Sequence, residues 1–359
     1  MLLKPLLAAL LLAVPAHAQI ELQESHSTAS LRGIDTAGEG IAWASGSGGT
    51  VLRTEDGGAL WQTCATPKGA EKLDFRGIQA IDAKTAVILS SGKGDASRIY
   101  KTTDGCQTWK LVFKNPDPEG FFDAIRRVTA HQFYVLGDPV QDKFAVFFSA
   151  DTGDTWAIAD DPGLDADKGD GAFAASNSSL ISIGATLYFG TGGTNNPHVY
   201  RTFANCPKDK TNVSCPVQWV KSDLPLASHN AAAGVFSLAG HMSADRANRA
   251  FTTLVAVGGT YDKPTETAGT AAFSHDGGKT WTASATPPAG YRSAVSYDRE
   301  NRVWIAAGTT GADISKDEGN TWTPLKNTDP PAAWNAIALP YLVGAKGRIG
   351  KLSPGASKP

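Results

Sequence analysis

Short apolar runs alternate with turn residues along almost the whole chain. Segments 31–49, 75–94 and 291–311 share one order: an apolar strand, a turn, a second apolar strand and a Gly-rich turn. Each is followed by another strand, a polar turn and one more short strand. Runs of this length bounded by Gly, Asp and Asn are typical of β-strands. The pattern therefore predicts an all-β protein made of four-stranded antiparallel units.

An eight-residue pattern, S/T-x-D-x-G-x-x-W, recurs at 54–61, 102–109, 149–156, 274–281 and 315–322. In such a turn the Asp carboxylate accepts hydrogen bonds from backbone N–H groups and the Ser/Thr hydroxyl, and Gly takes the positive-φ position. The Trp packs on the neighbouring sheet. A sixth, degraded copy has Ala204 at the Asp position. We assign structural, not catalytic, roles to Asp56, Asp104, Asp151, Asp276, Asp317, Trp61, Trp109, Trp156, Trp219, Trp281 and Trp322.

Seven such units can be counted, which predicts a single seven-bladed β-propeller over residues 19–353 with a tail at 354–359. The predicted blades are 30–66, 75–114, 121–160, 172–223, 230–286, 290–326 and 332–353. The last lacks both a box and a fourth strand. Residues 20–25 alternate apolar and polar side chains, so we expect them to close blade seven as its outer strand and to remove an exposed edge.

The N-terminal segment predicts that the protein is exported. The first 18 residues have a Lys, a nine-residue apolar run and an Ala-His-Ala cleavage site, which is typical of a secretory signal peptide. No later segment approaches 18 apolar residues, so no transmembrane segment is expected in the mature chain. A formal net charge of -2 provides no excess positive charge for binding nucleic acid. A hydrophobic content of 42% excludes a disordered chain. We expect a periplasmic or extracellular monomer.

Four cysteines suit an oxidising compartment. Cys206 and Cys215 bracket a polar insertion and are predicted to form a local disulfide. For Cys64 and Cys106 two alternatives stay open, a bridge between neighbouring repeats or two buried thiols. No CxxC, HExxH, GxSxG or helix-opening GxGxxG is present, so no metal or cofactor site is predicted. The acidic segment 160–170 (Asp160, Asp161, Asp165, Asp167, Asp170) could hold Ca²⁺, but a solvated loop is favoured.

The box resembles the Asp-box, or BNR repeat, of sialidases and many secreted propellers. Together with the LRGI and FRGI strands and the AxGxxG turn, it resembles the photosystem II stability/assembly factor family. That resemblance implies a single-domain, seven-bladed, non-enzymatic propeller with an assembly or partner-binding role. It also implies an arginine-rich surface that contacts a protein or peptide, such as an envelope or membrane-protein assembly client.

The innermost strands offer candidate binding residues. Arg32, Arg76 and Arg292 each stand 16 residues before a turn glycine, Gly48, Gly92 and Gly308 respectively. Equivalent positions converge around a propeller axis, so three arginines there would suit a carboxylate. Asp123 and Asn335 take that place in blades three and seven, and Asn177 and His229 are candidates in blades four and five. The alternative is that these arginines pair with acids on adjacent blades.

A sialidase-like glycan-binding or glycan-cleaving protein is the second functional hypothesis. It would use the three arginines on a substrate carboxylate, with Tyr291 as nucleophile and Asp123 as acid. The F/Y-R-I-P motif of that family is absent, because FRGI at 75–78 lacks the proline. The sequence therefore favours partner binding without catalysis.

Overall fold

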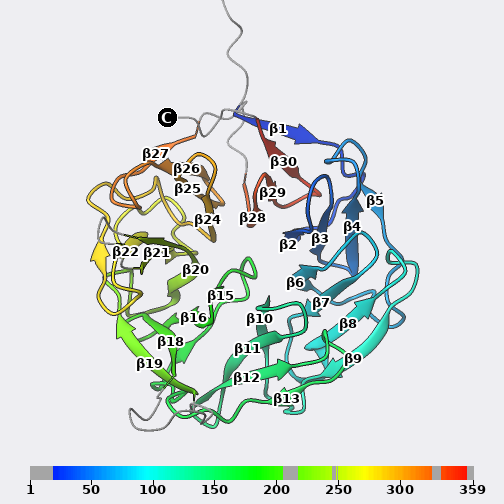
Figure 1. Cartoon of the computed structure of the whole chain (residues 1–359), viewed down its shortest axis with the longest axis horizontal. Coiled ribbons are helices and arrows are strands. Elements are labelled where there is room, and N and C mark those ends of the chain that lie inside the picture. Colours follow the sequence, from blue (N-terminus) through cyan, green and yellow to red (C-terminus); the bar gives the residue numbers. More distant parts are fainter. Residues whose placement is uncertain (1–18, 205–216, 245–247, 249, 326–332, 354–359) are drawn as a thin grey trace, which may run out of the picture.

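The computed structural model describes residues 19–204, 217–244, 248, 250–325 and 333–353. Its strands form a ring of antiparallel sheets around a central channel, as Figure 1 shows. Within the described residues the helical structure is a single 3₁₀ turn, η1 (Gly94–Ala96). The predicted all-β, seven-bladed propeller is confirmed.

Each blade begins with an inner strand at the axis and ends with an outer strand at the rim. Blades one to three contain β2 (Leu31–Thr36), β3 (Ala42–Gly46), β4 (Thr50–Thr54) and β5 (Gln62–Thr63); β6 (Phe75–Ala80), β7 (Ala86–Ser90), β8 (Arg98–Thr102) and β9 (Lys110–Lys114); and β10 (Phe122–Arg127), β11 (Phe133–Val140), β12 (Lys143–Ser149) and β13 (Ala157–Ile158). Blades four and five contain β15 (Leu180–Ile183), β16 (Thr186–Gly190), β18 (His198–Ala204) and β19 (Val217–Asp223); and β20 (Asn230–Ala244), β21 (Ala250–Thr260), β22 (Ala271–Ser274) and β23 (Thr282–Ala283). Blade six contains β24 (Ala294–Asp298), β25 (Val303–Gly308), β26 (Gly311–Ser315) and β27 (Thr323–Pro324), and blade seven β28 (Ala336–Ala338), β29 (Tyr341–Val343), β30 (Ile349–Leu352) and β1 (Ile20–Gln23).

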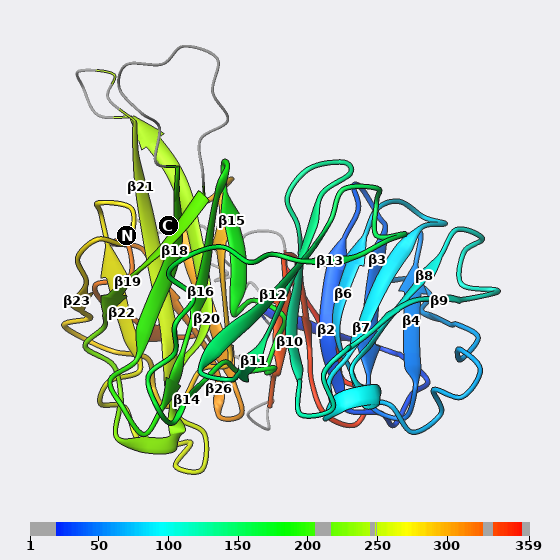
Figure 2. The same ribbon diagram turned by 90° about the horizontal axis from the view of Figure 1, so that it is seen from below.

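Two short strands extend blade five beyond the expected four. β14 (Asp170–Gly171) pairs with β17 (Gly192–Gly193), and β17 pairs with β20. In addition, β20 and β21 are the longest strands, and Figure 2 shows them rising with β18 above one face of the disc. The connections around blade four are therefore longer than the repeat predicts.

The N-terminal strand closes the ring as predicted. β1 pairs with β30, with Ile20 opposite Leu352. Gln23 Oε1 accepts a hydrogen bond of 2.9 Å from the indole of Trp61 in blade one. Lys351 Nζ in β30 donates to the carbonyl of Gly57, also in blade one, at 2.7 Å. The two ends of the described chain thus join blade seven to blade one.

The hydrophobic core lies between facing blades rather than inside one unit. Trp43 of blade one, for example, is buried with Ile78 and Tyr100 of blade two. The box tryptophan Trp61 packs edge-on against Tyr341 of blade seven at 5.6 Å between ring centroids. Burial of apolar surface at each of these junctions is what holds a blade against its neighbours.

The box turns have the hydrogen bonds expected of a folded Asp turn. Asp151 Oδ1 accepts from Ser149 Oγ at 2.8 Å and from the N–H groups of Asp154 and Thr155, and Oδ2 accepts from Thr155 Oγ1 at 2.6 Å. Donors directed at the carboxylate favour its charged form, and they lower the pKa of Asp151 to about 2.

Cys64 and Cys106 form a disulfide that joins the outer edge of blade one to the box turn of blade two. This resolves the alternative that the sequence leaves open. Cys206 and Cys215, the predicted signal peptide at 1–18 and the predicted tail at 354–359 lie outside the described residues.

Candidate functional site

Three of the innermost strands, β2, β6 and β10, carry a β-bulge near their beginning. The register shifts between Leu31 and Gly33 in β2, between Phe75 and Gly77 in β6, and between Phe122 and Ala124 in β10. The residue left over at each bulge is Arg32, Arg76 or Asp123. Because a bulged residue is released from the regular in-and-out alternation, its side chain can be aimed at the channel.

In blade five the bulge falls between Val235 and Ser237, so Phe236 takes this place. His229, the residue suggested by the sequence, lies in the turn before β20 and does not line the cavity at the start of the inner strands. The sequence could have identified Phe236. Val-Phe-Ser-Leu at 235–238 has the same order as Leu-Arg-Gly-Ile at 31–34, with an apolar residue, the bulged residue, a small residue and an aliphatic residue.

A cavity of about 440 Å³ opens where these inner strands begin, and we call it the arginine cavity. Its lining combines two guanidinium groups with four aromatic rings and the amide of Asn335, and includes Arg32, Arg76, Phe173, Phe236, Tyr261, Tyr291 and Asn335. Of the predicted ring residues, Arg32, Arg76 and Asn335 are brought together here.

The two guanidinium groups differ in how well they are paired. Arg76 Nε donates to Asp74 Oδ2 at 2.8 Å, and its Nη1 donates to the carbonyl of Ala174 at 3.1 Å. Arg32 Nε is buried and has no hydrogen-bond partner. Burial and the neighbouring Arg76 charge lower the pKa of Arg32. A buried, unsatisfied donor of a charged group is costly, so this cavity favours an anionic ligand.

The aromatic part of the lining is preorganised. Phe173 stacks on Phe236 with ring centroids 3.8 Å apart, and Tyr291 meets Phe236 edge-on at 4.8 Å. Tyr261 also meets Phe236 edge-on and is 53% exposed, which places it at the rim. Stacked and edge-to-face rings hold one another in position, so the cavity offers a rigid apolar surface beside its two cations.

Arg292 and Asp123 do not belong to this site, and the expectation of three converging arginines is wrong. Arg292 is 1% exposed, and its Nε and Nη2 both contact Asp313 Oδ2. Its Nη1 donates to the carbonyl of Tyr291 and to Thr310 Oγ1. Asp123 is buried, and burial together with nearby Asp138 raises the pKa of this carboxyl well above its usual value. Arg292 is therefore paired with an acid, but that acid belongs to the same blade and not, as the alternative expected, to an adjacent one.

Asn177 belongs to a segment that crosses the channel. Its Oδ1 accepts from the N–H of Ile125 at 2.8 Å, and its Nδ2 donates to the carbonyl of Ile78 at 3.3 Å. A Cβ on Gly77 would stand 2.7 Å from this Oδ1, so the approach requires glycine there. Residues 173–175 line the arginine cavity and residues 176–178 line a second cavity beyond it. Segment 173–178 thus divides the channel into two.

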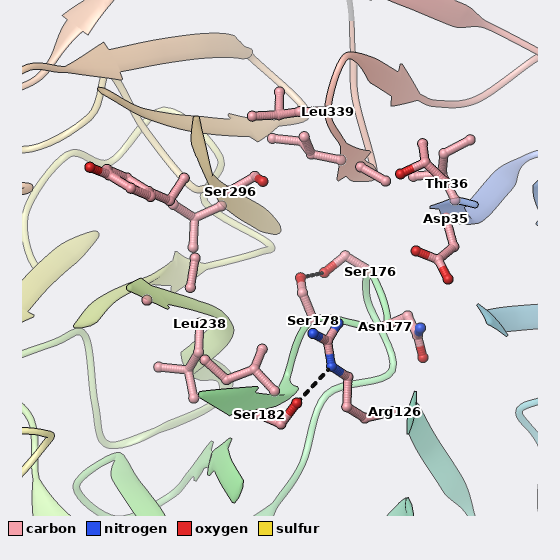
Figure 3. A pocket seen from close by; sticks show the side chains of 18 of the residues that line it. Asp35, Thr36, Arg126, Ser176, Asn177, Ser178, Ser182, Leu238, Ser296 and Leu339 are labelled. Carbon is pink, nitrogen blue, oxygen red and sulfur yellow. Dashed lines mark hydrogen bonds between the residues drawn. The ribbon is translucent and has the colours of Figure 1, made fainter. Parts of the chain in front are cut away.

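The second cavity, of about 350 Å³, lies where the inner strands end (Figure 3). Asp35 of β2 and Arg126 of β10 reach into it, and Arg126 Nε donates to Ser182 Oγ at 3.3 Å. Asp35 Oδ2 accepts from the N–H of Ala80 at 2.8 Å, but burial outweighs this bond and raises the pKa of Asp35 to about 6. No motif in the sequence marks Asp35 or Arg126, because each stands at the end of an otherwise ordinary inner strand.

The roles required for sialidase chemistry are not assembled at either cavity. The arginine cavity contains two of the three arginines, and its lining does not include Asp123. Burial raises the pKa of Tyr291, which is the wrong direction for a nucleophilic phenolate.

The described residues contain no helix that is long and apolar enough to span a membrane.

Among solved structures, YCF48 bound to D1 peptide matches with a TM-score of 0.60 at 15% sequence identity, covering 94% of this chain and 98% of that chain. YCF48 from Cyanidioschyzon merolae matches with a TM-score of 0.57 at 14% identity, covering 94% and 99%. The extracellular domain of a one-component system from B. thetaiotaomicron matches with a TM-score of 0.54 at 11% identity, covering 93% of this chain and 40% of that chain. No family model and no curated protein matches the sequence. At these identities the likeness concerns the fold, and this chain is a propeller that resembles YCF48.

Proposed function

We propose that this chain is an exported, non-enzymatic propeller that binds a protein or peptide partner in the arginine cavity. The observation that carries the proposal is the buried Nε of Arg32, which has no partner although it lies in a cavity with a second guanidinium. An arriving carboxylate would supply the missing acceptor, and charge-assisted hydrogen bonds of this kind are the strong ones.

The aromatic rings narrow the class of ligand. Phe173, Phe236 and Tyr261 give the cavity an apolar surface next to the cations. A matching ligand presents a carboxylate beside an apolar side chain, as a peptide does when it ends in an apolar residue. The likeness to YCF48, which has been solved with a D1 peptide, supports a peptide partner of a membrane-protein assembly by analogy with that protein.

Fluorescence anisotropy with labelled heptapeptides that end in Leu or Phe tests this proposal. Peptides with a free terminal carboxylate should bind, and the same peptides with an amidated end should bind at least tenfold more weakly. Arg32→Met should remove the preference for the free carboxylate. Arg98→Met is the matched control, because Arg98 is paired with Asp95 outside the cavity. Equal binding of the acid and amide peptides would refute a carboxylate site.

A further inference from the structure

A second polar cluster lies outside both cavities, where the segment after blade three meets blade four. Asp167, Asp170 and His198 each offer one ligand atom, and these three atoms lie within 4.8 Å of one another. His198 begins β18, and Asp170 begins β14. We propose that Asp167 Oδ2, Asp170 Oδ2 and His198 Nε2 bind a divalent transition-metal ion such as Zn²⁺.

The backbone brings the two carboxylates together. The N–H of Asp170 donates to the carbonyl of Asp167 at 3.0 Å, which closes a tight turn. Gly169 has a φ of +90° in this turn, a conformation that favours glycine. The sequence D-A-D-K-G-D at 165–170 therefore places two acids side by side because of its own local geometry, while His198 comes from a strand nearly thirty residues later.

Asp170 supplies the independent sign of a missing ligand. Its side chain is 1% exposed, and Oδ2 is buried without a hydrogen-bond partner. The other oxygen, Oδ1, accepts from Asn195 Nδ2 at 3.0 Å, which fixes the orientation of the carboxylate. A buried carboxylate oxygen with no donor is unfavourable unless a cation or a donor meets it.

The spacing of the ligand atoms suits a small metal ion. His198 Nε2 is 3.3 Å from Asp167 Oδ2 and 3.9 Å from Asp170 Oδ2. Ligands held tetrahedrally at Zn²⁺ distances stand about 3.4 Å apart, so small side-chain movements would complete the site. One imidazole and two carboxylates favour a transition metal over Ca²⁺ or Mg²⁺, which prefer oxygen ligands throughout.

The surroundings include a partner for the histidine and a competitor for the metal. Asp223 Oδ1 lies 2.9 Å from His198 Nδ1, although the pair is not aligned as a hydrogen bond. A carboxylate at the outer nitrogen of a metal-binding histidine is a frequent arrangement. Lys221 Nζ contacts Asp167 Oδ2 at 2.7 Å. The Lys221 side chain is 36% exposed, so it can move into solvent when a metal ion takes its place.

Asp167 and Asp170 also form part of a groove of about 550 Å³, and Phe173 lines both this groove and the arginine cavity. Three protein ligands leave coordination positions open. Because Asp167 is 53% exposed, these positions can be filled by water or by a partner's side chain. The proposed metal would therefore stand next to the proposed peptide site without depending on it.

Isothermal titration calorimetry of the full chain with Zn²⁺ tests the proposal. The wild-type chain should bind with a component that Asp170→Asn and His198→Gln each weaken at least tenfold. His131→Ala, which removes an exposed histidine outside the cluster, should leave this component unchanged. Lys221→Ala should tighten binding severalfold, because it removes the competing ammonium group.

The Lys221 variant keeps the proposal falsifiable if the buried Asp170 variant fails to fold, since Lys221 is partly exposed. Weaker or unchanged Zn²⁺ binding by Lys221→Ala would show that the cluster is an ion-pair network and not a metal site. Absence of a component sensitive to His198→Gln would overturn the proposal in the same way. Mn²⁺ paramagnetic resonance on the same variants gives a second readout that does not rely on heats.

Discussion

Arg292 and Arg32 stand at equivalent places in the repeat and have opposite surroundings. Arg292 is buried with Asp313, whereas Arg32 has an unsatisfied donor beside a cavity. The difference comes from one residue on the third strand of the same blade, since Asp313 of β26 is also buried. Spacing within the repeat can align the two arginines, but it cannot show which of them meets an acid.

Arg292→Met should lower the free energy of unfolding by about 3 to 5 kcal/mol, because it leaves the Asp313 carboxylate buried and unpaired. Urea unfolding measures this loss. The double variant Arg292→Met/Asp313→Leu should recover part of it, because no isolated charge is left. A single variant as stable as the wild type would mean that the pair contributes nothing to folding.

Asp35 should make the stability of the protein depend on pH. Its pKa is raised by burial to about 6 in the folded chain, so the folded state holds the proton more tightly than the unfolded state does. Stability due to this group is therefore fully present below about pH 4 and is lost as the pH rises through 6. Asp35→Asn, which stays neutral, should be more stable than the wild type by about 3 kcal/mol at pH 8 and nearly equal to it at pH 4.

Urea unfolding at the two pH values checks this expectation, with the exposed Asp160→Asn as the matched control. The Asn oxygen can still accept the N–H of Ala80, so the local hydrogen bond is retained. A stability difference that does not change between pH 4 and pH 8 would contradict the raised pKa.

At the level of elements, the sequence predicts local features well and non-local ones poorly. The box turns follow from eight neighbouring residues, and their hydrogen bonds stay within that stretch. Segment 173–178 could not be placed from its own sequence, because its contacts are with blades two, three and five, far away in the chain. The bulge at Phe236 is an intermediate case. The apolar pattern around it matches that of the other inner strands, but a Phe stands where blades one and two have Arg32 and Arg76, so the equivalence is not evident from residue type.

The Cys64–Cys106 bridge ties two elements that are already packed together. It closes a loop of 42 residues between blades one and two. Replacing both cysteines with alanine should lower the free energy of unfolding by about 2 to 5 kcal/mol, mainly because the unfolded chain gains freedom. Guanidinium unfolding of the double variant measures this loss. Asp104→Ala, which removes the box aspartate from the same turn as Cys106, provides a comparison in blade two. No loss of stability would mean that residual structure already restricts the unfolded chain around this junction.

At the scale of the whole molecule, closure of the ring decides whether seven blades act as one unit. Each blade buries its apolar face only against its neighbours, so an open ring would leave two faces without a partner. The sequence predicts this closure because residues 20–25 alternate and blade seven is one strand short. It does not predict how the channel is used, since the channel contents depend on side chains from several blades at once.

Substitutions in the closing strand β1 test whether ring closure makes the seven blades act as one unit. Ile20 of β1 is 2% exposed and belongs to the core shared by blades six and seven, whereas Leu22 of the same strand is 62% exposed. Ile20→Asp should therefore lower the free energy of unfolding by more than about 3 kcal/mol, because it buries a charge in an apolar junction.

Leu22→Asp is the matched control and should change the stability by less than about 0.5 kcal/mol, because surface substitutions away from special features are nearly neutral. A chain that begins at residue 25 should behave like Ile20→Asp and, in addition, self-associate in size-exclusion chromatography, since β30 then presents an unpaired edge. If that shortened chain stays monomeric and melts within a few degrees of the wild type, the ring does not need its N-terminal strand. In that case the seven blades would be held by their facing cores alone, and β1 would contribute little to the stability of the ring.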